Sequence, residues 1–128
     1  MRLPTICVIG LLMWCGAAAA ATSTVPKAKP TTCHASDFAF DQLKSRHQRN
    51  HVYIVGRVVN NCDKETGVEI KIAILDRTGG VLRISDFWPA STDNIPPHSG
   101  FSFQAEMEGN DLFDRFQVTV IDVKQWSE

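Results

Sequence analysis

Three histidines are the first residues in this sequence whose type and spacing could do chemistry. His47 and His51 stand four positions apart, so on a helical turn both imidazoles would lie on one face, where they could bind a metal ion. His34 could add a third ligand. Against such a site, His51 begins a stretch with strand periodicity, and the neighbouring arginines would repel a cation. We therefore expect no metal or other cofactor. A periplasmic protein that binds a metal or a small ligand through these histidines is kept as the alternative to the function predicted below.

Hydrolytic catalysis would need a nucleophile, a base and an orienting acid. Ser99 follows His98, and Ser85 precedes Asp86, but sequence neighbours seldom form such a set, and no nucleophile turn between a strand and a helix is recognisable. The 14 acidic residues are spread over predicted turns and outward strand positions, where contact with water explains them. We predict that the protein is not an enzyme.

Residues 1–21 have the layout of a cleavable export signal. Arg2 supplies a positive charge, an apolar stretch covers 6–14, and alanines fill 17–21. The bulky apolar part is too short for a membrane span. We predict cleavage after Ala21 and a secreted or periplasmic location. Cys15 leaves a lipid-anchored alternative open, although Trp14 stands before it, where that processing requires a small residue.

Cys33 and Cys62 are the two cysteines that remain after cleavage. In an oxidising compartment, two thiols left over in a small domain usually pair, so we predict a disulfide between them. Loss of Arg2 with the signal leaves 12 basic and 14 acidic residues, a net charge of about −2. Because this balance provides no basic field, we exclude nucleic acid as a partner.

The remaining chain is long enough for one core, preceded by a leader. Residues 22–32 hold two prolines, two lysines and one isolated valine, which predicts a flexible leader, and 33–128 form the domain. Residues 41–50 are polar and predict a loop or a single helical turn. Strands with alternating apolar residues are expected at 36–40, 52–59, 68–75, 81–87, 101–108 and 116–123. Six or seven strands joined by turns, such as the one at 76–80, predict an antiparallel β-sandwich.

Three segments of the central chain resemble the FxLYD family, a group of small Ig-like domains in exported and membrane-tethered bacterial proteins. They are Gly-Arg-Val-Val-Asn-Asn at 56–61, Ile-Ala-Ile-Leu-Asp at 72–76 leading into Gly79 and Gly80, and 95–103. The motif that names the family has Phe, Leu and Tyr where this chain has Ile72, Ile74 and Leu75, and this chain keeps only the final aspartate of the motif, Asp76. The resemblance implies an Ig-like sandwich that makes contacts in the cell envelope, and it supplies no catalytic residues.

Four aromatic residues are candidates for a contact surface. Phe87 and Trp88 stand beside a strand-ending proline, Trp126 lies near the C-terminus, and Tyr53 lies on the outward side of its strand. Packing of each ring against the core is the alternative interpretation. The predicted function is therefore a non-catalytic module, without a membrane span, that binds another envelope or extracellular protein.

Overall fold

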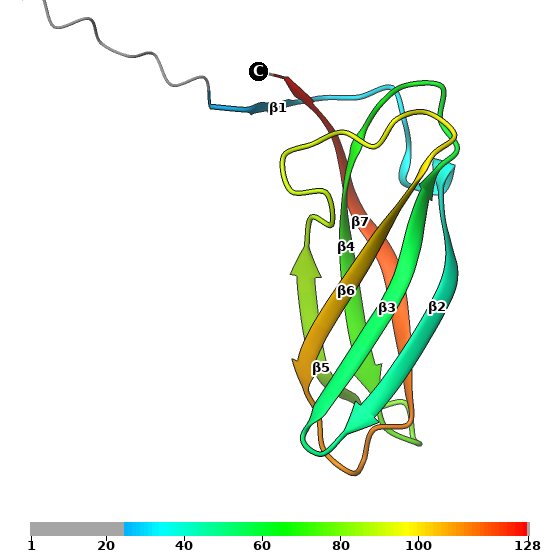
Figure 1. The fold of residues 1–128 in the computed structure, drawn as a ribbon, viewed down its shortest axis with the longest axis vertical. Coiled ribbons are helices and arrows are strands. Elements are labelled where there is room, and N and C mark those ends of the chain that lie inside the picture. The colour runs from blue at the N-terminus through cyan, green and yellow to red at the C-terminus, as the bar shows by residue number, and fades with distance from the viewer. Residues whose placement is uncertain (1–24, 128) are drawn as a thin grey trace, which may run out of the picture.

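A computed structural model of the chain describes residues 25–127 as two antiparallel sheets packed face to face (Figure 1). One sheet has the strand order β1-β7-β4-β5, and the other has the order β2-β3-β6. The strands are β1 (Lys27–Lys29), β2 (Phe38–Gln48), β3 (His51–Asn60), β4 (Gly67–Leu75), β5 (Val81–Phe87), β6 (Gly100–Glu108) and β7 (Arg115–Ser127). A single 3-10 turn, η1 (Ala35–Asp37), precedes β2. The predicted all-β, Ig-like sandwich is confirmed.

Aliphatic side chains from the two central strands fill the space between the sheets. Alternate residues of a strand point to the same side, so a period of two places every second residue in the core. The residues concerned are almost fully buried: Val68, Ile70, Ile72 and Ile74 on β4, and Val52, Ile54 and Val58 on β3. The rows of apolar residues in the sequence therefore mark the inner faces.

The segment 41–50 differs from the predicted loop or helical turn. β2 runs through most of it and pairs with β3 from Phe38 opposite Asn60 to Gln48 opposite His51, with one irregularity after Asp41. The strand lies at the edge of its sheet, and most of its residues are exposed. Exposure on both sides removes the apolar alternation by which a strand is recognised, so the prediction was wrong here.

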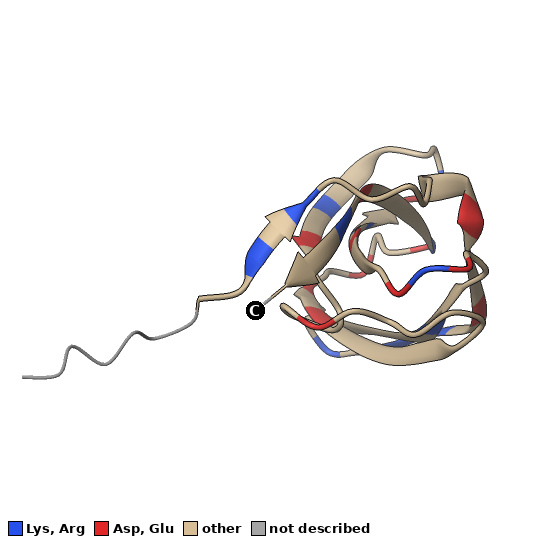
Figure 2. Cartoon of the chain, turned by 90° about the horizontal axis from the view of Figure 1, so that it is seen from above, with Lys and Arg blue, Asp and Glu red and all other residues tan. Residues whose placement is uncertain are grey.

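β1 lies within the segment 22–32 that was expected to be a flexible leader. Lys27, Ala28 and Lys29 pair with Ser127, Trp126 and Gln125 of β7. All three β1 residues are exposed, so backbone pairing rather than burial holds this strand. In the view from above, β1 with its basic residues lies next to the C-terminus (Figure 2).

Charge is spread around the rest of the sandwich. Figure 2 shows basic and acidic residues distributed around the sandwich and on its loops. Among residues 25–127, no helix has the length and apolar character that crossing a membrane requires. The predicted signal at 1–21, with Cys15, lies outside the described residues.

Candidate interaction surface

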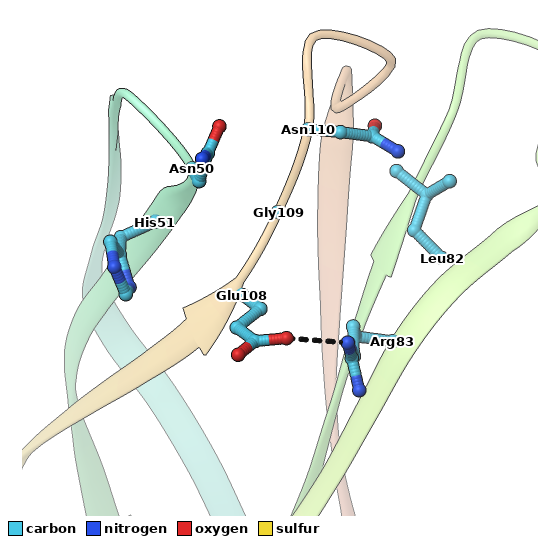
Figure 3. A pocket seen from close by; sticks show the side chains of 7 residues that line it. All are labelled: Asn50, His51, Leu82, Arg83, Glu108, Gly109 and Asn110. Atoms are coloured by element: carbon cyan, nitrogen blue, oxygen red, sulfur yellow. Dashed lines mark hydrogen bonds and ion pairs between the residues drawn. The ribbon is translucent and has the colours of Figure 1, made fainter.

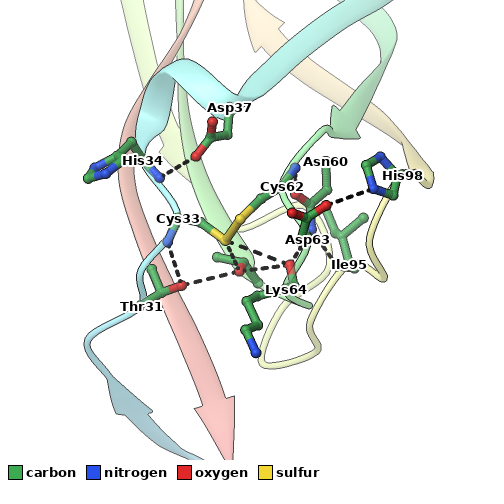
Figure 4. Close-up of a disulfide and its surroundings, with 11 residues drawn as sticks. Thr31, Cys33, His34, Asp37, Asn60, Cys62, Asp63, Lys64, Ile95 and His98 are labelled. Carbon is green, nitrogen blue, oxygen red and sulfur yellow. Dashed lines mark hydrogen bonds and ion pairs between the residues drawn. A yellow bond between two sulfur atoms is a disulfide. The ribbon is translucent and has the colours of Figure 1, made fainter.

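The predicted disulfide is present and closes one end of the sandwich (Figure 4). Cys33 and Cys62 are bonded, with their Cα atoms 5.9 Å apart. Cys33 belongs to the buried core, and the hydroxyl of Thr66 lies 3.1 Å from its sulfur. A bonded, buried sulfur is neither a nucleophile nor a metal ligand, so the role of the disulfide itself is structural.

Asn60, a residue that the sequence does not single out, fastens the loops around the disulfide. Its side-chain amide donates to the carbonyl oxygens of Lys64 and Ile95, both at 2.9 Å, and its Oδ1 accepts from the N–H of Cys62 at 2.9 Å. The residue is fully buried. Because its side-chain polar atoms all have partners, Asn60 positions loops and is not free to bind a ligand.

The three histidines do not come together. His47 pairs with the buried Val52, whereas His51 pairs with Gln48, so the two imidazoles belong to opposite faces of the β2–β3 hairpin. The ring of His47 packs against Phe113 at a centroid distance of 5.7 Å. His34 lies before η1, at the disulfide end. No cluster of three metal-binding side chains exists in the described part of the chain.

The two serine pairs likewise form no catalytic set. Ser99 Oγ donates to the Pro97 carbonyl at 3.4 Å, while the His98 ring lies 3.1 Å from Asp63. Ser85 stands opposite the inward Ile72, and the adjacent Asp86 stands opposite Lys71 on the outer side. Neither serine therefore has a base in contact with its hydroxyl.

A hollow of about 540 Å³ opens at the far end of the sandwich, between β5 and the two turns that flank β3 and β6 (Figure 3). Its charged residues Arg83 and Glu108 are paired at 2.7 Å and are 56% and 73% exposed. His51 lies at its rim and is paired with Glu106 at 3.2 Å, away from the hollow. Solvated and mutually neutralised charges give this hollow no reactive group.

Phe87 and Tyr53 lie on different sheets and in different surroundings. Phe87 stands opposite Ile70 and packs its ring against Phe103 at 6.1 Å, inside the sandwich. Tyr53 lies on the outer side of β3, beneath the guanidinium of Arg46 at 4.8 Å, and its hydroxyl donates to Glu106 at 3.4 Å. The structure therefore places Phe87 against the core and Tyr53 on a charged outer surface.

Trp88 and Trp126 meet on the outer side of the four-stranded sheet. Their rings pack edge to face with centroids 5.3 Å apart, and both residues are half-buried. The ammonium of Lys124 lies 6.0 Å from the centre of the Trp88 ring. The sequence indicates each tryptophan separately, but only the fold shows that they form one surface, which we call the tryptophan pair.

Two small residues hold the tryptophan pair in place. Gly67 lies under Trp126, where a Cβ would come within 2.5 Å of the indole. The Asn94 side chain accepts from the N–H of Trp126 and donates to its carbonyl, both at 2.8 Å, as a neighbouring strand would. The Trp126 Nε1 is buried without an acceptor among the described residues, so packing and these backbone contacts orient the ring.

Comparison with known proteins gives a likeness of fold. No family model matches the chain, and no curated protein matches it. It is similar to the crystal structure of a DUF1425 family member from Shewanella sp. pv-4, with 12% sequence identity and a TM-score of 0.51. The similarity covers 79% of this chain and 92% of that chain. The likeness extends to a small β-rich domain, and no family model supports the narrower FxLYD name.

Proposed function

We propose that this protein is a non-catalytic module, exported by way of residues 1–21, that binds another protein of the cell envelope or the extracellular space. The tryptophan pair carries the proposal. Tryptophan is enriched among the residues that dominate the binding energy of protein interfaces, because one ring buries a large area at a small cost in conformational entropy. The FxLYD-like segments at 56–61 and 95–103 support the same class of function.

The geometry of the pair suits a contact surface. Trp88 and Trp126 are packed against each other before any partner arrives, and Gly67 and Asn94 fix the second ring and its backbone. Binding of a partner would therefore cost little conformational entropy in these two side chains, because they are already ordered. Next to Trp126, a hollow of about 270 Å³ is lined by Asp93 and Asn94 among others, and it could take a side chain of the partner.

Site-specific photocrosslinking tests the proposal. A photoreactive amino acid is placed at Asp93, which is exposed and lines the hollow beside Trp126. We expect a discrete crosslinked protein in the cell envelope, and we expect Trp88→Ala to remove it, since truncation of a central anchor costs at least about 2 kcal/mol of binding free energy. Mass spectrometry of the crosslinked band identifies the partner.

A matched position provides the control. Leu112 is 61% exposed and lies in the β6–β7 turn at the opposite end of the sandwich. The same photoreactive group at Leu112 should yield no such band. Equal crosslinks from Asp93 and Leu112, or an unchanged band in a folded Trp88→Ala variant, would show that the tryptophan pair is not the contact surface.

A further inference from the structure

The outer face of the three-stranded sheet is divided by charge across its strands. The edge strand β2 carries Lys44 and Arg46 on this face, and the opposite edge strand β6 carries Glu106 and Glu108. The central strand β3 places Tyr53 and Val55 between them. These four charged residues are exposed, whereas Asp41 of β2 and Arg57 of β3, farther along the same face, are ion-paired with each other at 2.6 Å. We call this surface the divided face.

One row of the divided face shows the arrangement most clearly. Arg46, Tyr53 and Glu106 stand directly opposite one another on β2, β3 and β6. The guanidinium carbon of Arg46 lies 4.8 Å from the centre of the tyrosine ring, and the carboxylate of Glu106 accepts a hydrogen bond from the tyrosine hydroxyl at 3.4 Å. The tyrosine therefore separates the two opposite charges of its own row.

The basic side of the face has no acidic partner within the molecule. Neither Lys44 nor Arg46 forms an ion pair with any residue in the described range 25–127. On the acidic side, Glu106 is paired with His51 at 3.2 Å, and Glu108 is paired with Arg83 of β5 at 2.7 Å. A second molecule that brings carboxylates to β2 and a cation to β6 would complement both sides at once.

A second copy of the chain meets that requirement under one symmetry. If two divided faces meet about a two-fold axis that runs along β3, β2 of each copy lies on β6 of the other, and Arg46 faces Glu106 twice. A two-fold axis across the strands would instead place β2 on β2 and oppose like charges. The charge pattern thus selects one of the two orientations.

We infer that the divided face is a self-complementary interface through which two copies of this protein associate about a two-fold axis along β3. Tyr53 and Val55 form its less polar centre, with Val55 36% exposed. A shallow hollow of about 350 Å³ beside Tyr53, bounded by Lys44 and Gln104 among others, provides room for side chains of the other copy. The tryptophan pair lies on the other sheet, so the dimer would present two such pairs and gain avidity.

Charge exchange tests the inference on the protein expressed from its complete sequence. We expect wild-type protein to sediment as a dimer that weakens with salt, because the contacts are exposed ion pairs. Arg46→Glu alone and Glu106→Arg alone should each raise the dimer dissociation constant by at least about tenfold, since each opposes like charges. Sedimentation velocity over a concentration series measures these constants.

Recombination of the changes distinguishes the proposed symmetry from general loss of charge. In an equal mixture of the Arg46→Glu and Glu106→Arg variants, position 46 of each copy faces a charge of opposite sign at position 106 of the other, so a heterodimer should form. A single chain with both changes should dimerise again. Arg77→Glu, in the exposed β4–β5 turn, is the matched control and should leave the dimer unchanged.

Three outcomes would overturn the inference. They are a wild-type protein that is monomeric at every concentration, a dimer that survives both single reversals, and reversals that abolish the dimer without recovery in the mixture or the double variant. Circular dichroism of each variant verifies that it is folded. Because this face is on the other sheet, any of these outcomes leaves the tryptophan-pair proposal to be decided by its own crosslinking test.

Discussion

Asp76 organises the β4–β5 turn through one carboxylate oxygen. Its Oδ1 accepts hydrogen bonds from the hydroxyl and the N–H of Thr78 at 2.7 and 2.9 Å, and from the N–H of Gly80 at 2.8 Å. Gly79 completes the turn with a φ of +85°, a conformation that glycine adopts without strain. Hydrogen bonds from the Thr78 hydroxyl first, and then from the Gly80 N–H, hold the pKa of Asp76 below its ordinary value of 3.8.

A lowered pKa makes the contribution of Asp76 depend on pH in one direction. The stabilisation by the ionised carboxylate is fully present above the ordinary pKa of 3.8 and is lost as the pH falls through the lowered value. We predict that Asp76→Ala lowers the free energy of unfolding at neutral pH and that the difference from wild type narrows in acid. Urea unfolding at a series of pH values measures it.

The exposed Asp111, in the β6–β7 turn, provides the reference for this prediction. Asp111→Ala should change the stability little at any pH. A deficit in Asp76→Ala that is the same at neutral and acidic pH would mean that the charge of Asp76 contributes nothing and that the turn depends on shape alone.

At the scale of strands, the sequence predicted those elements that bury one face. Ile70, Ile72 and Ile74 alternate with less apolar neighbours because they cross the core, and this alternation is visible without a structure. The part of β2 that follows Phe40 and the whole of β1 were not predicted as strands, for the same physical reason. Their residues are exposed, and what stabilises them is backbone pairing with a neighbour whose position only the fold determines.

The candidate surface was predictable only in part. Trp88 and Trp126 can be singled out in the sequence because a large aromatic ring near a strand end either packs against the core or contacts a partner. Their mutual contact depends on the path of the 88–99 loop, which brings Asn94 beside β7. Gly67 gives no signal in the sequence, since its role appears only when Trp126 is placed above it.

Gly67 therefore offers a way to disturb the tryptophan pair without removing either ring. In Gly67→Ala the new methyl group would lie 2.5 Å from the Trp126 indole, so the ring must shift from its present position beside Trp88. We predict an overpacking cost of about 1–3 kcal/mol in the free energy of unfolding, a changed tryptophan emission spectrum, and a weaker crosslink from Asp93.

Lys71→Ala is the matched substitution, since Lys71 lies on the same side of β4 as Gly67 but pairs with Thr119 and Asp86 rather than with an indole. It should alter neither the emission spectrum nor the crosslink. If Gly67→Ala left the crosslink at wild-type strength while the spectrum changed, the orientation of Trp126 would be irrelevant to binding.

For the molecule as a whole, the disulfide is the largest single constraint. Cys33 and Cys62 are 29 positions apart, and closing a loop of this length removes conformational freedom from the unfolded chain. We predict that replacing both cysteines with alanine lowers the free energy of unfolding by about 3 to 4 kcal/mol. That is a large share of the roughly 5–15 kcal/mol that holds a small domain folded.

Chemical unfolding of the double alanine variant and of reduced wild-type protein provides the measurement. The two should agree, because both lack the covalent link and keep the packing of the two sheets. A loss below about 1 kcal/mol would mean that the unfolded chain is already compact between the two cysteines.

The antiparallel pairing of β1 with the end of β7 also determines how the molecule would bear a mechanical load. Lys27 pairs with Ser127, and Lys29 pairs with Gln125, so tension applied between Lys27 and Ser127 acts on the outermost pair alone at any moment. The strand would peel rather than shear, and it would yield at low force. Extension would then reach Cys33, where the bond to Cys62 prevents the chain between them from lengthening. Under tension, the segment that contains β1 would therefore extend first, and its extension would end at Cys33, where the disulfide ties the chain to Cys62.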